Sequence, residues 1–407
     1  MKNGYKKTSL GVLPSEWEVV KLREICEINP KNIDKLPSKF YYINLESVEK
    51  GNLLNTKEIY KNKAPSRAKR ILKKGDILFQ LVRPYQKNNF YFDLDGNFVA
   101  STGYAQLRTK ENKKFIFQYL HFDKFVNAVI EKCTGSNYPA INSSTFSNLK
   151  IPLPPLNEQG KIAEILSSYD EAILLTSNLI SAKKEFKKAL MQNLLTAKIR
   201  FPNFNGIWKE VKLGDIGEFK TSSVDKIINS NEKIVSLINY MDVYKNTHIS
   251  KKLNLSKTSA TEQEINKFYI QKGDILFTPS SETPDDIGHS AVIIDDFDCA
   301  LYSYHLIRFR TFNKFDICFL GYIFNNEKIL KQFTRLSQGT TRYTLSIKDF
   351  QNIKIKLPNL AEQTKIAEIL SSVDEEINLL NKKLEQLNLQ KRGVMQNLLS
   401  GKIRVKL

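Results

Sequence analysis

The side chains best suited to chemistry in this chain are cations gathered over a short stretch of its first half. Seven Lys and Arg residues fall within the fourteen positions from Lys61 to Lys74. This density of positive charge suits contact with phosphate groups, and it predicts an affinity that falls as salt rises. A solvated charged face in a lysine-rich chain is the alternative interpretation. The members of the run from which we expect phosphate contact are Lys61, Lys63, Arg67, Lys69 and Arg70.

Patterns for covalent or nucleotide-driven catalysis are missing from the sequence. It holds no GxxxxGK[ST] phosphate loop, no GxSxG nucleophile elbow and no GxGxxG motif that opens a helix. Asp76 and Asp274 both lie in the hexapeptide KGDILF, where paired acids could hold a metal ion for nuclease work. A Gly-Asp turn that leads into a buried strand explains them more simply. We therefore expect no catalytic residue in this chain.

The four cysteines and four histidines are scattered along the chain. They form no CxxC pair, no HExxH motif and no Cys/His cluster. This spacing disfavours a zinc site and a disulfide framework. We expect no metal ligands among them, and interpret the cysteines as small buried hydrophobes and the histidines as ordinary loop or core residues.

The elements that must position the charged and polar side chains are repeated. IPLPPLNEQGKIAEIL from Ile151 matches IKLPNLAEQTKIAEIL from Ile355, an offset of 204 residues. The offset holds without a gap through LMQNLLTAKIR and VMQNLLSGKIR. Upstream, WEVVKL begins at Trp17 and WKEVKL at Trp208, and KGDILF occurs in both halves. The chain is therefore two copies of one unit.

Each copy has a variable part followed by a well-matched part. The variable parts carry short β-branched runs such as KIVSLINY and SAVIID between turn signals, which predicts small mixed domains rich in strand. No Pro or Gly lies between Lys161 and Arg200, and after Pro358 the second matched part has only Gly393 as an interior weak point, so both parts are predicted helices. The expected divisions are a globular domain at 1–150, a helical spacer at 151–200, a second globular domain at 201–354 and a second helical spacer at 355–407.

Apolar residues of the helical parts recur at the seven-residue spacing of a coiled-coil seam. Thr176 and Lys183 fall on seam positions in the first copy, where a polar side chain could set register or partner. Two helices that pack only on each other are the simpler alternative. A helix of about 40 residues is about 60 Å long, so the pair can act as a spacer. The expected rows are Ile366, Val373, Leu380, Leu387 and Val394 beside Leu370, Ile377, Leu384 and Leu398, and in the first copy Ile162, Tyr169 and Leu190 beside Ile165, Ile173, Leu179, Phe186 and Leu194.

The fold class predicted from this layout is α+β. Two globular mixed α/β domains are joined by two long antiparallel coiled-coil helices, in a pseudo-twofold internal repeat. The 407 residues include 41% hydrophobic residues, enough for packed cores, which excludes a disordered polycation.

Charge is unevenly distributed along the chain. The whole chain has 62 Lys and Arg against 43 Asp and Glu, a net charge of +19. The first 150 residues hold 26 cations and 14 acids, whereas residues 201–354 hold 20 and 18, so the first domain is the basic one. No stretch approaches 18 consecutive apolar residues, and the first residues lack the apolar core of a signal peptide. We expect a soluble cytoplasmic protein that does not bind a membrane.

The motifs, in this order and twice over, resemble the specificity subunit of a Type I restriction-modification system. The likeness covers nearly the whole chain. It rests on the twofold layout, on the Trp-x-x-x-x-Leu openings at Trp17 and Trp208, on KGDILF in both halves, and on LPPLNEQGKIAEIL and LPNLAEQTKIAEIL at the helix starts. The resemblance implies that each variable part is a target-recognition domain that reads one half of a bipartite DNA site. It also implies that the helices fix the distance between the halves, and that the chain has no catalytic centre.

The resemblance further implies partners for this chain beyond double-stranded DNA. In the family, the helices dock methyltransferase subunits, expected here as two copies, and restriction subunits join through them. S-adenosylmethionine, ATP and Mg²⁺ are expected on these partner subunits and no cofactor in this chain. The docking candidates recur in register at both helix starts: Glu158, Gln159, Ile162, Ile165 and Leu166, with Glu362, Gln363, Ile366, Ile369 and Leu370.

Candidate base-reading residues lie on polar loops where the two copies diverge, after KGDILF and before the helices. Arg and Gln suit bidentate contacts to guanine and adenine edges. The loops before the helices resemble the Gly-Ser/Thr-rich turn near DNA in the family, although the first copy lacks an arginine at the position of Arg342. A simple turn or surface polar group is the alternative for any one of them. The DNA-binding candidates are Gln80, Arg83, Tyr85, Gln86, Lys87, Ser136, Asn137 and Tyr138 in the first copy, and Thr278, Ser280, Ser281, Thr340, Thr341, Arg342 and Tyr343 in the second.

Other functions remain open at the level of sequence. A specificity subunit of a modification-only or Type II-like assembly has the same motifs. A coiled-coil adaptor that binds only protein would show no salt-dependent affinity for DNA. A stand-alone nuclease or methyltransferase would modify DNA unaided, which the missing catalytic motifs disfavour.

Overall fold

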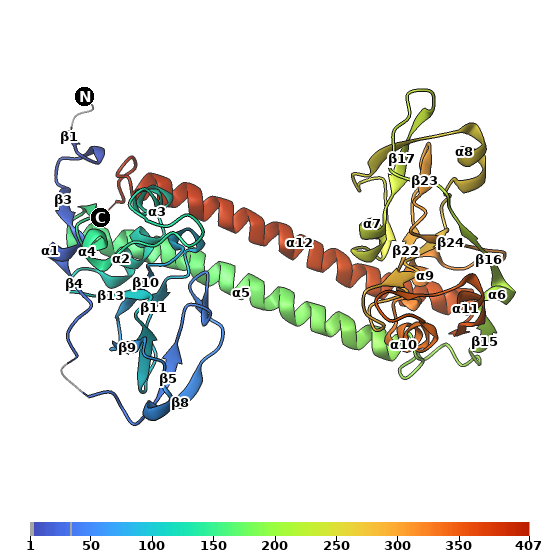
Figure 1. Ribbon diagram of the computed structural model, residues 1–407, viewed down its shortest axis with the longest axis horizontal. Helices are drawn as coiled ribbons and strands as arrows, with labels where there is room; N and C mark the ends of the chain where they lie inside the picture. The colour runs from blue at the N-terminus through green and yellow to red at the C-terminus, as the bar shows by residue number, and fades with distance from the viewer. Residues whose placement is uncertain (1–3, 33–34, 407) are drawn as a thin grey trace. The chain divides into compact units, whose positions relative to one another are not determined.

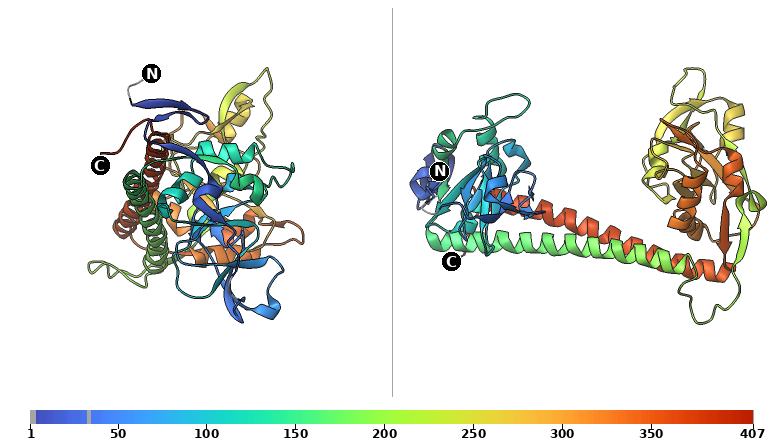
Figure 2. Two further views of the ribbon diagram at one scale, coloured as in Figure 1. Left: turned by 90° about the vertical axis from the view of Figure 1, so that its left-hand side faces the viewer. Right: turned by 60° about the horizontal axis from the view of Figure 1, so that its bottom comes forward.

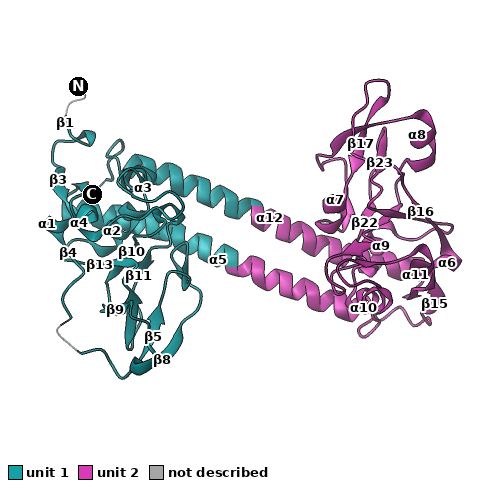
Figure 3. Cartoon of the chain, viewed as in Figure 1, with its two compact units in different colours: residues 1–177, 382–407 teal, residues 178–381 magenta. Residues whose placement is uncertain are grey.

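The computed structural model describes residues 4–32 and 35–406 (Figure 1). The chain forms two compact units (Figure 3). Unit 1 comprises residues 1–177 and 382–407, and unit 2 comprises residues 178–381. Each unit therefore contains one globular part together with segments of both long helices, α5 (Leu156–Leu194) and α12 (Leu360–Leu398).

The globular part of unit 1 is built on two four-stranded sheets. The antiparallel sheet has the order β11-β10-β13-β4, and the mixed sheet has the order β8-β5-β12-β9 with β5 and β12 parallel. All four residues of β10 are buried, in keeping with its run of three apolar residues before Gln80. The strands and helices of unit 1 before α5 are β1 (Tyr5–Thr8), β2 (Gly11–Pro14), β3 (Glu18–Lys21), α1 (Leu22–Ile25), β4 (Cys26–Ile28), β5 (Lys39–Ile43), β6 (Val48–Glu49), β7 (Asn52–Leu53), β8 (Lys57–Tyr60), the 3₁₀ helix η1 (Lys61–Lys63), β9 (Ala68–Ile71), β10 (Ile77–Gln80), the 3₁₀ helix η2 (Pro84–Gln86), β11 (Phe90–Tyr91), β12 (Phe98–Ser101), β13 (Tyr104–Thr109), α2 (Lys113–Leu120), α3 (Asp123–Ile130), α4 (Ser143–Ser147) and β14 (Lys150–Leu153).

Unit 2 repeats this plan with differences in strand count. Its larger sheet has the order β16-β24-β20-β22-β18, and its smaller sheet has the order β19-β17-β23, in which β17 and β23 are parallel as β5 and β12 are in unit 1. The strands and helices of unit 2 between α5 and α12 are β15 (Lys209–Lys212), α6 (Leu213–Ile216), β16 (Gly217–Thr221), β17 (Lys233–Ile238), α7 (Tyr240–Tyr244), β18 (His248–Ile249), β19 (Ser256–Ala260), α8 (Glu262–Phe268), β20 (Ile275–Phe277), β21 (Ser280–Ser281), β22 (Ser290–Ile293), β23 (Ala300–Tyr302), β24 (Ile307–Thr311), α9 (Ile317–Ile323), α10 (Glu327–Leu336), β25 (Tyr343–Thr344), α11 (Ile347–Asn352) and β26 (Lys354–Leu357).

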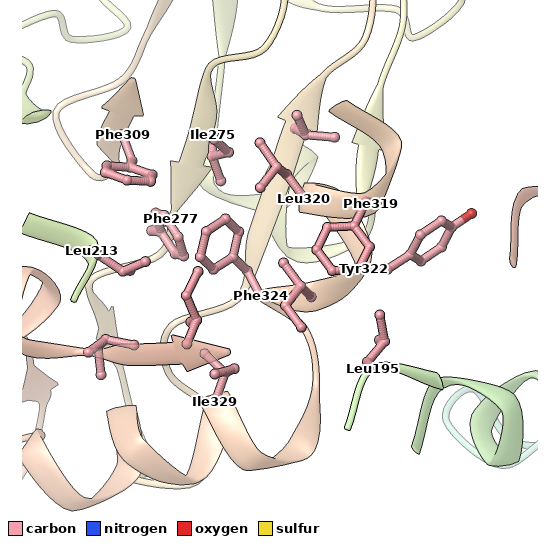
Figure 4. Close-up of a cluster of buried hydrophobic side chains, with 14 of the residues drawn as sticks. Leu195, Leu213, Ile275, Phe277, Phe309, Phe319, Leu320, Tyr322, Phe324 and Ile329 are labelled. Carbon is pink, nitrogen blue, oxygen red and sulfur yellow. The ribbon is translucent and has the colours of Figure 1, made fainter. Parts of the chain in front are cut away.

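The core of each unit includes side chains from both long helices. In unit 2, Phe277 of β20 and Phe309 of β24 pack in one cluster with helix α9 and with Leu195, which follows α5 (Figure 4). In unit 1, Phe79 of β10 stacks on Phe146 of α4, with ring centroids 4.6 Å apart, in the cluster that also holds the start of α5 and the end of α12. The helices are therefore part of each globular core, and this packing fixes the position of each globular part on the helix segments of its own unit.

The two long helices lie side by side in each unit and run antiparallel (Figures 1 and 2). In unit 2, Lys183 of α5 pairs with Glu376 of α12 at 2.7 Å, and one turn further along α5 Lys187 pairs with Asp374 at 2.6 Å. Residue numbers rise on α5 as they fall on α12. This confirms the predicted fold class of two mixed α/β domains on two antiparallel helices.

The seam of the helix pair agrees with the prediction more closely in α12 than in α5. In α12, the buried residues of the predicted rows are Ile366, Leu370, Val373, Ile377 and Leu398. In α5 the prediction was wrong for Leu179 and Phe186, which are 44% and 51% exposed. Thr176, which was predicted on the seam, is buried, and its hydroxyl donates to a carbonyl of its own helix, which lowers the cost of burial. Ile180, which lies outside the predicted rows, is buried as well.

A left-handed turn follows each long helix and sends the chain back toward a globular part. Ala197 and Gly401, which are equivalent at the repeat offset, have φ of 57° and 69°. Such a residue ends a helix by satisfying its last carbonyl groups, and glycine adopts this conformation most easily. The turns deliver Arg200 to unit 2 and Arg404 to unit 1.

Candidate nucleic-acid interface

The site begins at the KGDILF strand, which has the same support in both units. The buried carboxylate of Asp76 accepts hydrogen bonds from Arg108 Nε at 2.9 Å and Nη2 at 2.8 Å, and from Gln106 Nε2 at 2.7 Å. In unit 2, Asp274 accepts from Arg310 Nε at 2.6 Å and Nη2 at 2.7 Å. Hydrogen bonding to the carboxylate raises the pKa of each arginine. Both aspartates therefore anchor the strand, and within the described part of the chain no three metal-ligating side chains gather to hold an ion.

The loop that leaves this strand pairs with the loop before the long helix in both units. In unit 1, Arg83 N donates to Pro139 O at 2.7 Å, and Val82 and Ala140 form an isolated β-bridge. In unit 2, the corresponding loops form strands β21 and β25, which pair antiparallel. Two loops about sixty residues apart in the sequence thus become one surface in each unit. The structure brings together the two loop sets that the sequence singled out separately.

Arg83 and Tyr138 form a stacked pair on this surface in unit 1. The Arg83 guanidinium lies over the Tyr138 ring, 4.1 Å from its centroid, and Tyr138 is 65% exposed. Arg83 has φ and ψ of 54° although Pro84 follows it, and a residue before proline avoids the helical regions. Strained backbone of this kind concentrates at binding sites. The stacked pair is therefore held in place before any ligand arrives.

Gln80 lies beneath this surface and supports the loop. Its side chain is buried, its Nε2 donates to Gln86 Oε1 at 2.8 Å, and its Oε1 accepts from Asn88 N at 3.2 Å. Tyr85, by contrast, is 50% exposed, and Lys87 pairs with Asp123 of α3. Direct contact with a base therefore suits Arg83 and Tyr85 better than Gln80.

In unit 2, the paired loops are joined by a contact between two predicted residues, and they are supported by a tyrosine that the sequence did not single out. Arg342 Nη2 donates to Ser280 Oγ at 3.2 Å, and Tyr240 OH donates to Ser280 O at 3.0 Å. Thr278 and Ser281 are buried. The residues missed at this site lie in helix α7 and in the loop 282–289. Tyr244 and His289 both bond to the Asp286 carboxylate, and the Tyr240 ring stacks on Tyr244.

No local signal marks the two tyrosines, because α7 lies forty residues before the loop that it contacts. The divergence of the loop after KGDILF was the available signal for Asp286 and His289. The other loop candidates, Ser136 and Asn137 in unit 1 and Thr340 and Thr341 in unit 2, are exposed at the turns before the helices. Tyr343 is partly buried in β25.

The basic run of the first domain lies on the other sheet of unit 1. Lys61 and Lys63 are in η1, after edge strand β8, and Lys69 and Arg70 are in edge strand β9. Lys61, Lys63, Arg67 and Lys69 are exposed, whereas burial lowers the pKa of Arg70. The run thus links the two edge strands of the β8-β5-β12-β9 sheet, and the paired loops extend from the β10 sheet.

Glu158 and Glu362, two of the predicted docking residues, are buried within their own units. Glu158 accepts from Trp17 Nε1 at 2.9 Å and from Arg404 Nε and Nη2, both at 2.8 Å. Glu362 likewise accepts from Trp208 Nε1 at 3.2 Å and from Arg200 at 2.9 and 2.8 Å. Arg404, near the end of the second repeat, thus completes a buried contact in unit 1, and Arg200, at the end of the first repeat, does the same in unit 2.

The remaining docking candidates are also largely internal. Gln159 and Gln363 each donate to a proline carbonyl before their helix, at 2.8 and 3.0 Å. Ile162 and Leu166, like Ile366 and Leu370, are core residues, and only Ile165 and Ile369 are partly exposed. Internal packing accounts for the recurrence of these residues, so the docking role given to them from sequence stays a prediction.

A second pair of equivalent carboxylates joins each globular part to the helices. Asp170 of α5 accepts from Gln118 Nε2 at 2.5 Å and from Lys391 Nζ at 2.5 Å. At the repeat offset, Asp374 accepts from Tyr322 OH at 2.7 Å and pairs with Lys187 at 2.6 Å. In each unit this carboxylate therefore joins the globular part to one helix and that helix to the other.

The four cysteines are free thiols. Burial raises the pKa of Cys26 to about 12. None of the helices in the described ranges, residues 4–32 and 35–406, combines the length and apolarity needed to cross a lipid bilayer.

Comparison with known proteins agrees with this architecture. The profile of the Type I restriction modification DNA specificity domain matches residues 14–183 and again residues 205–389. The Type I restriction enzyme MjaVIII specificity subunit of Methanocaldococcus jannaschii is 28% identical over 97% of this chain and 94% of its own length.

Two solved structures share the fold. A chain described under "Structural basis underlying complex assembly and conformational transition of the type I R-M system" aligns with a TM-score of 0.64 and 22% identity, over 96% of this chain and 99% of its own. The Type I restriction-modification S subunit from M. genitalium aligns with a TM-score of 0.56 and 17% identity, over 96% of both chains. With two copies of the specificity domain that together cover most of its length, the chain belongs to the family of Type I restriction-modification DNA specificity proteins.

Proposed function

We propose that this chain selects the DNA site of a Type I restriction-modification complex, with each unit reading one half of a bipartite sequence. The observation that carries the proposal is the pair of joined loops at the same place in both units. The frame beneath them is repeated, with Asp76 and Arg108 matched by Asp274 and Arg310. The loops themselves differ between units, as two readers of different half-sites must.

The chemistry of the loops fits recognition of base edges and backbone. Arginine and amide side chains make the bidentate contacts that distinguish guanine and adenine in the major groove, and lysine contacts phosphates. In unit 1 the readers would be Arg83, Tyr85 and Gln86. In unit 2 they would be Arg342 and Ser280, with Thr340 and Thr341 at the adjoining turn. The basic run from Lys61 to Arg70 would supply sequence-independent attraction.

Partner subunits complete the proposed complex. Methyltransferase subunits, two in number, would dock along the long helices, and restriction subunits would join through them. Ile165 and Ile369 are the partly exposed members of the predicted docking set. In this proposal S-adenosylmethionine, ATP and Mg²⁺ belong to the partners, the chain itself performs no catalysis, and the complex acts in the cytoplasm. A modification-only or Type II-like assembly would use this chain in the same way.

The experiment that tests the proposal is base-resolution mapping of N6-methyladenine in matched host strains with and without this gene. The expected result is the loss of one bipartite motif, which gives both half-sites and their spacing. Replacing residues 1–150 by another such domain should change one half of that motif and leave the other half and the spacing intact. An unchanged methylome, with the partner genes expressed, would contradict the proposal and favour a protein-binding adaptor.

A further inference from the structure

A deep cationic cleft lies in unit 1 beside the paired loops. Its volume is about 740 Å³, and its walls come from the loop at η2, the start of α3 and the last turns of α12. All these segments belong to unit 1. Six cations line it: Lys50, Lys87, Lys124, Lys391, Arg392 and Lys402.

The charge of the cleft is only partly balanced by its own residues. Asp123 is the one acid among the residues that line it, and it pairs with Lys87 and, at 3.9 Å, with Arg392. Lys391 is held by Asp170 at 2.5 Å. Burial and the nearby lysines lower the pKa of His121 to about 4, so this histidine adds no charge near neutral pH. The cleft therefore keeps a surplus of positive charge, with Lys50 and Lys402 exposed.

The cleft is continuous with the proposed reading surface. Gln86 and Lys87 belong to the loop that carries Arg83, and they also line the cleft. Helix α3 packs against η2 on one side, and its first residues, Asp123 and Lys124, face α12 across the cleft. A ligand that contacts the loop can therefore extend directly onto α12.

The second repeat keeps five of the seven charges of this cleft, whereas Lys50 and Lys87, which lie in the variable part, have Asn254 and Ala291 at the offset of 204 residues. At the repeat offset, Lys124, Lys391 and Lys402 correspond to three lysines, Arg392 corresponds to a lysine, and Asp123 corresponds to a glutamate. Where one of these five residues changes, the sign of its charge does not. Selection for charge rather than for a particular shape is what contact with a polyanion requires. The corresponding residues in unit 2 are Lys328, Lys187, Lys198, Lys188 and Glu327.

We propose that this cleft binds the phosphodiester backbone of the DNA that flanks the half-site read by unit 1. Helix α12 then contacts DNA as well as spacing the two readers. The inference rests on the proposed function, because it takes duplex DNA to be the ligand of the adjoining loops. An acidic segment of a partner protein is the competing occupant. Continuity with the loop at Arg83, and the repetition of charge at five equivalent positions of the second repeat, favour DNA.

The test uses the full chain co-purified with its methyltransferase subunits, and a duplex that carries the mapped motif. The dissociation constant is measured between 50 and 300 mM salt for the wild type and for the triple variant Lys50→Gln, Arg392→Gln, Lys402→Gln. The three side chains are exposed, and the Arg392 side chain is 74% exposed, so the variant should fold. If each contacts one phosphate, the log-log slope becomes less steep by about 2.7, and binding at 0.1 M salt weakens several hundred-fold.

The matched control keeps charge at the same positions, as Lys50→Arg, Arg392→Lys, Lys402→Arg, and should keep the wild-type slope. The glutamine variant should lose affinity equally for the motif and for unrelated duplex, because phosphate contacts carry no sequence information. An unchanged slope in a variant with a wild-type melting temperature overturns the inference. Loss of the methyltransferase subunits with an unchanged DNA slope also overturns it, in favour of the acidic protein segment. If the wild-type complex shows no preference for the motif, it is the proposed function that fails.

Discussion

Arg404 offers the sharpest test of how the tail of the chain holds unit 1 together. Its guanidinium makes a bidentate pair with the fully buried carboxylate of Glu158, and it also bonds to Glu16 at 2.6 Å. The substitution Arg404→Ala leaves the Glu158 carboxylate buried, with Trp17 Nε1 as its remaining side-chain donor among those described. Breaking a buried pair in this way costs about 3–5 kcal/mol. Because the Arg404 side chain is 32% exposed, we expect the lower end of that range.

The assay follows from the distribution of tryptophan. The chain has two tryptophans, Trp17 in unit 1 and Trp208 in unit 2, and each donates to the buried glutamate of its unit. In a Trp208→Phe background the fluorescence therefore reports unit 1 alone. For a unit of about 200 residues, a loss of about 3 kcal/mol should lower the melting temperature by about 6–12 °C.

Two controls separate the ion pair from general damage. Adding Glu158→Gln to Arg404→Ala removes the stranded charge and keeps an acceptor for Trp17, so it should recover a large part of the loss. The matched variant Arg200→Ala, followed by Trp208 fluorescence, should destabilise unit 2. An unchanged unit 1 transition in Arg404→Ala would refute the reasoning, as would a double variant less stable than the single one.

Three further outcomes follow from other parts of the structure. Gly401→Ala should destabilise unit 1 by more than about 1 kcal/mol, because its φ is 69° and an added Cβ would lie 2.5 Å from a proline ring, whereas Ala197→Gly should stabilise unit 2 slightly; thermal melts check both. Arg83→Ala and Tyr138→Ala should relax one base of the methylated motif, with about 1–3 kcal/mol less discrimination, and leave the other half-site unchanged in a methylome map. Burial lowers the pKa of His121 to about 4 in the folded chain, against about 6.5 in the unfolded chain. Its contribution to stability is therefore present above pH 6.5 and is lost as the pH falls toward 4. The variant His121→Gln should show a smaller change of the urea midpoint over that pH range.

The repeat made the frame predictable from sequence. Trp17, Glu158 and KGDILF recur at fixed places, and these residues form the buried contacts that each unit needs. The helices were equally predictable from the sequence, because long runs without Pro or Gly and a seven-residue apolar spacing are local signals. The errors at Leu179 and Phe186 lie where the predicted seam positions Thr176 and Lys183 are polar, so the apolar spacing there is a weaker guide to the buried face.

The recognition surface was predictable only in part, because it is made by contacts between remote segments. Arg83 and Tyr138 were each singled out by residue type and by loop divergence, but their stacking depends on pairing between two loops. Tyr240 was missed because its helix has no turn or charge signal and reaches Ser280 only in the folded domain. Gln80 had the right chemistry for an adenine edge, yet its amide is used to hold Gln86.

The burial of Glu158 and Glu362 changes what recurrence between repeats means in this chain. Residues that match at both helix starts were natural candidates for binding the same partner twice. In the structure they share a different role: Glu158 forms a salt bridge with Arg404, and Glu362 with Arg200, each from the opposite repeat. Matched buried residues therefore preserve the contacts that close each unit, whereas at the cleft beside α12 three lysines recur and two further charges recur in sign alone. Recurrence of charge at exposed positions, rather than recurrence of identity at buried ones, is the pattern that points to a shared ligand.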